Sequence, residues 1–405
     1  MGRAAKRESL PPSDQVLNRP GFRREPYSWL MPNRLAGHSR ATNTLNRICF
    51  IGAMPPPVHG VSVVNTRIVD LVRAAGALEL LIDTAPSAPR WGRGDRTRRI
   101  RTLGTALLKY CAAALARRID TVYVGLSGGA GLVFDVLVVS IGRLFGLKLF
   151  LHHHSYAYLR RPTIVSRVLV WVAGPRTTHI VLCVDMKNRL IHSHTGASSV
   201  FVLSFGATID SVETNRARLM PLRVGYLGNI MASKGIFEYI EVMDRLTELY
   251  PAVEGRIAGP FWDVDIENQV LARARGVARL SFIGPVHGEA KKTFLNGIDV
   301  LLFPSSYAHE ADPTVVHEAL AAGVPVIAWD RGCIRSWLTP DCGMVVGAMD
   351  SFVEAALAQM LAWLAEPDRF SAASTSAKSI HSEHCKEERK KLQLLLHKVL
   401  LDQQL

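Results

Sequence analysis

The sequence lacks three features that would each point to a particular class of protein. Its six cysteines include no C-x-x-C pair, and most lie in apolar surroundings, which favours reduced, buried thiols in a cytosolic protein. No charged-then-apolar signal opens the chain. The longest apolar stretch, residues 131–151, is interrupted by Asp135, Arg143 and Lys148, so we do not expect it to span a bilayer. These absences predict a cytoplasmic protein.

Two patterns that could hold a cofactor are incomplete. The glycine-rich turn at 125–131 is similar to a dinucleotide-binding turn, but Phe134 stands where the third glycine should be, and the expected acid downstream is missing. Residues 152–154 are consecutive histidines after an expected strand. Neighbours on a strand point to opposite faces, and no Asp, Glu or Cys cluster lies nearby to complete a zinc site. We therefore expect no metal and no cofactor.

The chain has 405 residues, of which 48% are apolar, enough for two hydrophobic cores and hence two domains. Its net charge of +13 is unevenly distributed. Residues 1–46 hold eight Arg or Lys against three acids, and residues 90–101 hold six arginines against one Asp. We expect residues 1–46 to be a basic, disordered tail.

The second basic run, beside Trp91, precedes an amphipathic apolar segment at 103–116. We expect it to contact lipid phosphate on an anionic membrane. Nucleic-acid binding is not expected, because no recognised fold signature or interleaved aromatics accompany the run. The residues assigned to this acceptor or membrane side are Arg96, Arg98 and Arg99.

The most informative stretch is residues 299–328, DVLLFPSSYAHEADPTVVHEALAAGVPVIA. The apolar run Val300–Phe303 predicts a buried strand. Asp312 followed by Pro313 predicts a helix start, since Asp caps free N–H groups and Pro tolerates the first helical position. Gly323 is expected to end this helix, and a second buried strand follows it.

This unit places two carboxylates, Glu310 and Glu318, on either side of a helix N-terminus. The N–H groups near Thr314 and Val315 have no helical partner, and with the helix dipole they favour a diphosphate. A carboxylate only accepts hydrogen bonds, so each acid can hold sugar or ribose hydroxyls. Taken alone, the spacing favours a different interpretation, a capped surface helix that happens to carry two glutamates.

The wider context resembles family-4 (group 1) retaining glycosyltransferases of the GT-B fold. In that family the first Glu contacts the donor sugar and the second the ribose, roles that the resemblance assigns to Glu310 and Glu318. One departure leaves the donor open, because Ala311, Asp312 and Pro313 stand where many members have a small residue, an aromatic and Gly. The matching residues are Pro304 and Ser305, Glu310, Pro313, Glu318 and Ala319, Ala322 and Gly323, Pro325 and Val326, and 330–332.

The resemblance also assigns residues outside this stretch. Gly60 ends a Pro/Gly loop that would meet the donor phosphate, and Gly228 opens the corresponding loop of the second domain. Lys234 would bind the diphosphate, whereas Asn229 replaces the Arg that the family usually has there. A histidine after the third strand would line the donor sugar, and His154 fits best, with His152 second.

The resemblance covers residues 47–370 and implies two Rossmann-like α/β domains whose parallel sheets face a central cleft. The expected division is a tail at 1–46, an N-terminal acceptor domain at 47–203, a linker at 204–222, a nucleotide-sugar-binding domain at 223–370, and a helical segment at 371–405 that crosses back to the first domain.

The implied function is retaining transfer of a sugar, of the hexosyltransferase type, from a nucleotide-diphosphate-sugar to a lipid-linked or polysaccharide acceptor in cell-surface or exopolysaccharide biosynthesis. His154 and Glu310 would be the catalytic residues, without a required metal. Two alternatives stay open. One is a non-catalytic nucleotide-sugar-binding protein of the same fold, motivated by Asn229, and the other is a Rossmann-type sugar-nucleotide-modifying enzyme.

Overall fold

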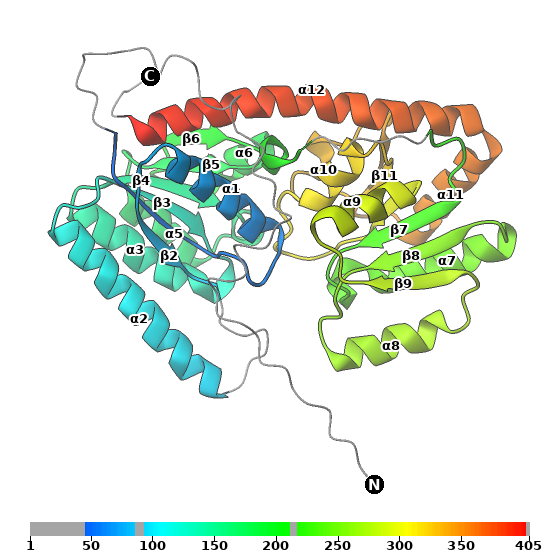
Figure 1. Cartoon of the computed structure of the whole chain (residues 1–405), viewed down its shortest axis with the longest axis horizontal. Helices are drawn as coiled ribbons and strands as arrows, with labels where there is room; N and C mark the ends of the chain where they lie inside the picture. Colours follow the sequence, from blue (N-terminus) through cyan, green and yellow to red (C-terminus); the bar gives the residue numbers. More distant parts are fainter. Residues whose placement is uncertain (1–44, 86–92, 211–216, 402–405) are drawn as a thin grey trace, which may run out of the picture. The chain divides into compact units, whose positions relative to one another are not determined.

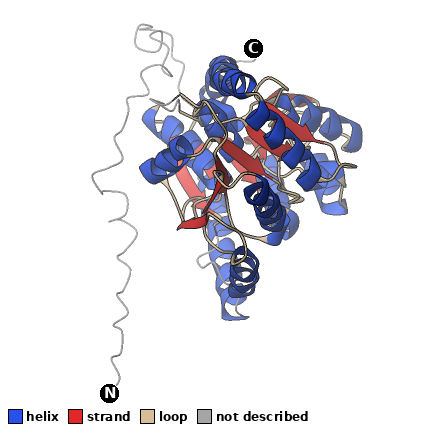
Figure 2. Cartoon of the chain, turned by 90° about the vertical axis from the view of Figure 1, so that its right-hand side faces the viewer, coloured by secondary structure: helices blue, strands red, loops and turns tan. Residues whose placement is uncertain are grey.

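The computed structural model describes residues 45–85, 93–210 and 217–401, and of residues 93–96 only the backbone. Within these ranges the chain forms two six-stranded sheets (Figure 1). Every strand pair in both sheets is parallel, and helices flank the strands on both sides (Figure 2). The expected α/β class with parallel sheets is therefore confirmed. The expectations for residues 1–44 and Trp91 lie outside the described residues.

The first sheet has the strand order β2-β1-β3-β4-β5-β6. Its central strands are buried on both faces, as parallel strands between helical layers should be. The strands are β1 (Ile48–Gly52), β2 (Leu78–Asp83), β3 (Thr121–Leu126), β4 (Lys148–His153), β5 (Thr178–Val181) and β6 (Ser199–Val202). The helices are α1 (Gly60–Ala74), α2 (Arg93–Leu115), α3 (Leu132–Leu144), α4 (Ala157–Arg160), α5 (Ile164–Ala173) and α6 (Val184–Ser193).

The second sheet has the order β9-β8-β7-β10-β11-β12, the doubly wound order typical of a Rossmann fold. Apolar side chains cover both of its faces and form two separate core clusters. The strands are β7 (Arg223–Leu227), β8 (Glu254–Ala258), β9 (Leu280–Gly284), β10 (Val300–Phe303), β11 (Val326–Trp329) and β12 (Gly343–Val346). The helices are α7 (Ile236–Leu249), α8 (Val264–Ala274), α9 (Gly288–Gly297), α10 (Thr314–Ala321) and α11 (Phe352–Ala365).

A last helix, α12 (Pro367–Leu400), connects elements of both sheets. It packs against α10 and α11 of the second sheet. Near its C-terminal end, the carbonyl of Leu400 accepts a 2.9 Å hydrogen bond from the backbone N–H of Asn46, just before β1. The Asn46 side chain also donates to the carbonyl of Val399 at 3.0 Å. Figure 1 shows α12 running past α6 and α10.

Two local features were not expected from the sequence. The arginine run preceding residue 103 is helical, because α2 begins at Arg93 rather than after the run. No expectation covered β2, an edge strand that pairs only with β1 and is partly exposed. Its mixed pattern, LELLID, lacks the continuous apolar character that marks the central strands.

The expectation of reduced thiols is wrong for two of the cysteines. Cys183, directly before α6, and Cys333, in the segment after β11, form a disulfide across 150 residues of sequence. Both residues are buried. The apolar surroundings of these cysteines were expected. The pairing was not, because it joins an element of the first sheet to one of the second across a long stretch of sequence. The other four cysteines are free.

Candidate functional site

The loops that carry most of the predicted site follow β7 and β10, which are neighbours in the second sheet. The connections from these two strands lead to opposite ends of the sheet, and such a switch point is where open α/β sheets bind ligands. The loop after β7 turns through Gly235, whose φ of +78° and closeness to the Pro304 carbonyl exclude a Cβ. The Ser306 N–H donates to the Ser233 carbonyl at 3.0 Å. The two loops are thus held against each other.

Glu310 lies in the loop after β10 and is mostly buried. Its carboxylate forms an ion pair with the ammonium of Lys234, from the loop after β7. It also accepts a 2.8 Å hydrogen bond from the Ser305 hydroxyl. The Lys234 ammonium lies 4.9 Å from the centre of the Tyr307 ring, within cation–π range. The structure therefore brings together two residues, Lys234 and Glu310, that the sequence assigned separately.

Glu318 lies in the second turn of α10, where its carboxylate pairs with the ammonium of Lys291 at 2.5 Å. Lys291 belongs to α9, and both side chains are largely buried. Lys291 could not be identified from the sequence, because no local spacing links it to Glu318, 27 positions further on. Each of the two predicted acids thus has its own lysine partner.

The prediction that Asp312 caps α10 is wrong. The residue before the helix is Pro313, and no side chain caps the helix start. Asp312 is only 3% exposed, and its carboxylate accepts hydrogen bonds from three other groups. They are the Ser204 hydroxyl at 2.6 Å, the Phe205 N–H at 2.8 Å and His317 Nε2 at 2.6 Å.

The start of α10 is therefore open in the sense that no side chain caps it. The N–H groups of Thr314 and Val315 have no intrahelical acceptor, and Asp312 does not occupy them. Gly60, the first residue of α1, lies against this turn, since a Cβ added there would stand 3.3 Å from the Thr314 hydroxyl. The N-terminal ends of α1 and α10 thus come close to each other. Both helix dipoles favour an anion there.

His154 directly follows β4 and is buried, as are His152 and His153. Burial, with a smaller effect from the charge of His59, lowers the pKa of His154 to about 3, so the ring is neutral near pH 7. Neither of its nitrogens has a hydrogen-bond partner in the described part of the chain. His152, in contrast, bonds to the Tyr123 hydroxyl at 2.9 Å. A neutral ring with one donor and one acceptor nitrogen can bond to a ligand hydroxyl or carbonyl.

The loops at the carboxyl ends of the first sheet contact the loop that carries Glu310. Ser155, next to His154, bonds through its hydroxyl to His309 Nδ1 at 2.8 Å. Gly128, after β3, also lies against His309, which a Cβ at that position would approach to 3.0 Å. His309 was not identified from the sequence, since its partners lie more than 150 residues away. These contacts bring the loops at the carboxyl ends of β3 and β4 next to the loop that follows β10.

The remaining predicted residues fall into two groups. Gly228 and Asn229 begin the loop after β7, where the Asn229 carbonyl accepts a 3.1 Å bond from the Tyr226 hydroxyl. Arg98 and Arg99 lie on α2, a helix of the first sheet. Of Arg96 only the backbone is described, so its side chain lies outside the described residues.

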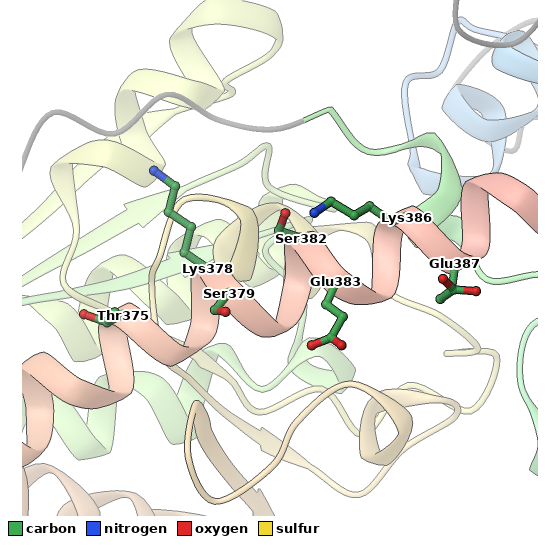
Figure 3. Close-up of a pocket in the computed structure, with 7 residues that line it drawn as sticks. All are labelled: Thr375, Lys378, Ser379, Ser382, Glu383, Lys386 and Glu387. Carbon is green, nitrogen blue, oxygen red and sulfur yellow. The ribbon is translucent and has the colours of Figure 1, made fainter.

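A shallow polar depression elsewhere contains none of the predicted residues. It follows one face of α12 (Figure 3), and its lining residues are Thr375, Lys378, Ser379, Ser382, Glu383, Lys386 and Glu387. Within residues 45–85, 93–210 and 217–401, no three or more His, Cys, Asp or Glu side chains group as metal ligands. In the same ranges no helix is long and apolar enough to cross a membrane.

Comparison with solved structures supports the fold assignment. The Anabaena protein HepE, in complex with UDP-glucose, aligns with a TM-score of 0.65 at 14% identity over 87% of this chain and 99% of HepE. Sucrose-phosphate synthase from Thermosynechococcus elongatus gives 0.64 at 14% identity over 87% and 99% of the two chains. WaaG, a glycosyltransferase involved in lipopolysaccharide biosynthesis, gives 0.60 at 15% identity over 85% and 98%.

A search of curated proteins finds no match. Residues 210–378, which contain β7–β12, Lys234, Glu310 and Glu318, match the family described as glycosyl transferases group 1. Residues 210–378 therefore carry a group 1 glycosyltransferase domain, and the two parallel sheets have the GT-B fold, as in the solved structures to which the chain is similar.

Proposed function

We propose that this enzyme transfers a sugar from a nucleotide-diphosphate-sugar to a lipid-linked or polysaccharide acceptor, with retained configuration. Residues 223–370 hold the donor and residues 47–203 the acceptor. The observation that carries the proposal is the pair of lysine–glutamate contacts, Lys234 with Glu310 and Lys291 with Glu318, on either side of the open start of α10. The complex of HepE with UDP-glucose supports a nucleotide-sugar as donor.

In this proposal the donor's diphosphate binds between the N-terminal turns of α10 and α1. The N–H groups of Thr314 and Val315 donate to phosphate oxygens, and Gly60 allows close approach because it has no side chain. Lys234 exchanges its carboxylate partner for a phosphate. Gly228 and Asn229 begin the loop that carries Lys234 and lie beside the same phosphates, but neither of them has a cationic side chain. The negative charge that develops on the departing diphosphate is stabilised by the two helix ends and by Lys234.

The two acids have different roles. Once Lys234 bonds to phosphate, Glu310 is free to accept hydrogen bonds from sugar hydroxyls and to orient the transferred sugar. Glu318 lies in the second turn of α10 and accepts hydrogen bonds from the ribose hydroxyls of the nucleotide. His154 contacts a sugar hydroxyl from the first sheet, and its neutral ring suits this role because both nitrogens lack partners in the described residues. No carboxylate is assigned as a nucleophile.

The proposal also covers the setting of the reaction. The enzyme acts in the cytoplasm, at the inner face of the membrane, in cell-surface or exopolysaccharide biosynthesis. Arg96, Arg98 and Arg99 belong to the side that meets the acceptor or the membrane. Their support is the basic character of α2, whose described side chains include four Arg or Lys and no acid.

The experiment is a screen of UDP-, GDP- and ADP-sugars by thermal shift, followed by calorimetry on Glu310→Gln and Glu318→Gln. A ligand present at a hundred times its Kd stabilises the fold by about 2.7 kcal/mol, which is readily seen. Loss of a hydrogen bond to a charged group costs about 1.5–3 kcal/mol, or roughly 10- to 100-fold in Kd. Glu318→Gln should weaken both the free nucleoside diphosphate and the nucleotide-sugar.

Glu310→Gln should weaken only the nucleotide-sugar, since its partner is the sugar and Lys234 stays available to phosphate. Glu354→Gln removes an exposed ion pair with Arg245 and is the matched control that leaves binding unchanged. Proton NMR of the first product formed gives the anomeric configuration and tests retention. The proposal is wrong if no nucleotide-sugar binds, or if binding and turnover survive the loss of both acids.

A further inference from the structure

Three helices of the first sheet, α2, α3 and α5, form a layer whose outer face is unusually apolar. Helix α3 packs against both α2 and α5. The inner side chains of this layer are buried against the sheet, among them Tyr110 of α2, Val139 of α3 and Leu169 of α5. The outer side chains are not covered by any described part of the chain. We call these outer side chains the α2/α3/α5 face.

Large apolar side chains recur on this face at helical spacing. On α2, Leu108 and Leu115 are two turns apart, and Leu115 is 74% exposed. On α3, Val133, Leu137 and Leu144 follow the same side of the helix. On α5, Ile164, Val168 and Trp171 do so as well. Leu144, Ile164 and Trp171 are 80%, 81% and 73% exposed. Single exposed apolar residues are common, but a shared face of such residues on three adjacent helices marks an interaction surface.

The charges on the same helices have one sign. Among the described side chains of α2, α3 and α5, the only acid is Asp135. Asp135 is buried and accepts from the Ser127 N–H at 2.8 Å, so it adds no surface charge. Two more acids lie beside α2, Glu79 and Asp120, and each is paired with an arginine. The basic residues of the three helices are Arg98, Arg99, Arg101, Lys109, Arg143 and Arg167.

Other helices carry a different balance of acidic and basic side chains. Helix α7 carries four acids and a single arginine, and α12 carries four acids beside its seven Arg or Lys. The combination of exposed apolar side chains with an excess of basic over acidic side chains is therefore a property of the α2/α3/α5 face. A partner that fits it must offer negative charge next to an apolar phase, which is the chemistry of an anionic phospholipid surface.

We propose that the α2/α3/α5 face docks the enzyme on an anionic phospholipid bilayer. Trp171, Ile164 and Leu144 enter the boundary between headgroups and acyl chains, and Arg143 and Arg167 contact lipid phosphates. The inference deepens the proposed peripheral location by naming the surface that binds. It rests on no feature of the donor site, so its test is independent of glycosyl transfer.

The test is co-sedimentation of the full chain with vesicles, without donor or acceptor. The enzyme should bind vesicles of phosphatidylcholine mixed with phosphatidylglycerol and should not bind vesicles of phosphatidylcholine alone. A double variant, Leu144→Ala with Trp171→Ala, should bind the mixed vesicles at least about tenfold more weakly, because most of the inserted apolar surface is lost. A second variant, Arg143→Gln with Arg167→Gln, should bind more weakly by a similar factor and lose its sensitivity to salt.

The control is Trp262→Ala, which removes an exposed tryptophan that lies next to the second sheet. This variant should bind mixed vesicles like the wild type. Brominated lipid should quench part of the tryptophan fluorescence of the wild type, and Trp171→Phe should remove that part while keeping most of the binding. All these positions are on the surface, so circular dichroism and the melting temperature should not change.

Two results would overturn the proposal. The first is that the enzyme does not bind the mixed vesicles, or that the double apolar variant binds them as well as Trp262→Ala does. The second is that analytical ultracentrifugation finds a dimer that only the face variants dissociate. That result would mean that a second copy of the chain, and not lipid, covers the face. Donor binding measured on the same variants should match the wild type in every case.

Discussion

Replacing Asp312 by alanine should destabilise the enzyme more than removal of any exposed acid. The carboxylate is buried and accepts three hydrogen bonds, from the Ser204 hydroxyl, the Phe205 N–H and His317 Nε2. Ser204 and Phe205 come directly after the last strand of the first sheet, whereas Asp312 and His317 belong to the second. The network therefore links the two sheets as well as stabilising α10.

The size of the effect follows from the groups that lose their acceptor. Hydrogen bonds to a charged group contribute about 1.5–3 kcal/mol each, but they are not additive within one network. A buried donor that is left without an acceptor costs about 1–3 kcal/mol. We therefore expect Asp312→Ala to lower the free energy of unfolding by about 4 kcal/mol, a large part of the stability of an ordinary protein.

Asp312→Asn should cost less, about 1–2 kcal/mol, for a reason visible in the structure. The amide keeps one oxygen for Ser204 and Phe205, which both bond to the same carboxylate oxygen. Its NH₂ group would face His317 Nε2. In the described residues His317 Nδ1 has no partner, so the ring can carry its proton there and accept the new bond through Nε2.

The assay is urea unfolding followed by circular dichroism, with Asp330→Ala as control. Asp330 forms an exposed ion pair with Arg335 at 2.6 Å, and its loss should cost less than about 1 kcal/mol. A double-mutant cycle of Asp312→Ala with Ser204→Ala should give a coupling energy of about 0.5–3 kcal/mol. The prediction is contradicted if Asp312→Ala lowers the free energy of unfolding no more than Asp330→Ala does. It is also contradicted if the cycle gives no coupling energy between Ser204 and Asp312.

Two further predictions concern buried ionisable groups and the disulfide. Burial raises the pKa of Asp135 to about 7, so the folded enzyme keeps a proton that the unfolded chain loses above about pH 4, and stability falls as the pH rises between these values. In urea unfolding, Asp135→Asn should have the same free energy of unfolding as the wild type near pH 4 and a free energy up to about 4 kcal/mol higher above pH 7. A difference between variant and wild type that is the same at both pH values would contradict this. Reduction of the Cys183–Cys333 disulfide releases a constraint across 150 residues, worth about 5 kcal/mol in the chain-entropy description. Dithiothreitol should therefore lower the urea midpoint of the wild type and leave that of Cys183→Ser unchanged, whereas equal midpoints for the wild type with and without reductant would contradict the pairing.

Local signals in the sequence were sufficient for much of the second sheet. The strand at Val300–Phe303 has the expected bounds, because four apolar residues are followed by a proline that ends pairing. The strand Leu280–Gly284 was also placed correctly, as was Arg223–Leu227. In each case the information lies within a few residues, in an apolar run and the glycine or proline next to it.

The contacts that build the site could not be predicted in this way. Lys291 and Glu318 are 27 positions apart, and the Asp312 carboxylate bonds to a serine 108 positions earlier. Asp312 followed by Pro313 has the pattern of a helix cap, and local propensity favours that reading. A buried hydrogen-bond network with three donors outweighs one capping bond of about 1 kcal/mol. Tertiary structure therefore decided the role of this residue.

The position of Asp312 also bears on the donor. An acid next to the start of α10 would oppose the binding of a diphosphate there. At 6 Å and an effective dielectric constant of 20, two unit charges repel by about 3 kcal/mol. In this structure the carboxylate oxygens are instead occupied by Ser204, Phe205 and His317, and the helix start remains uncapped.

Loss of those hydrogen-bond donors would free the Asp312 carboxylate to cap α10 itself. We therefore expect Ser204→Ala to weaken nucleoside diphosphate binding as well as stability, although Ser204 touches no donor. Calorimetric titration of this variant with the nucleoside diphosphate that binds the wild type measures the effect, and an unchanged Kd would show that Asp312 does not influence the helix start.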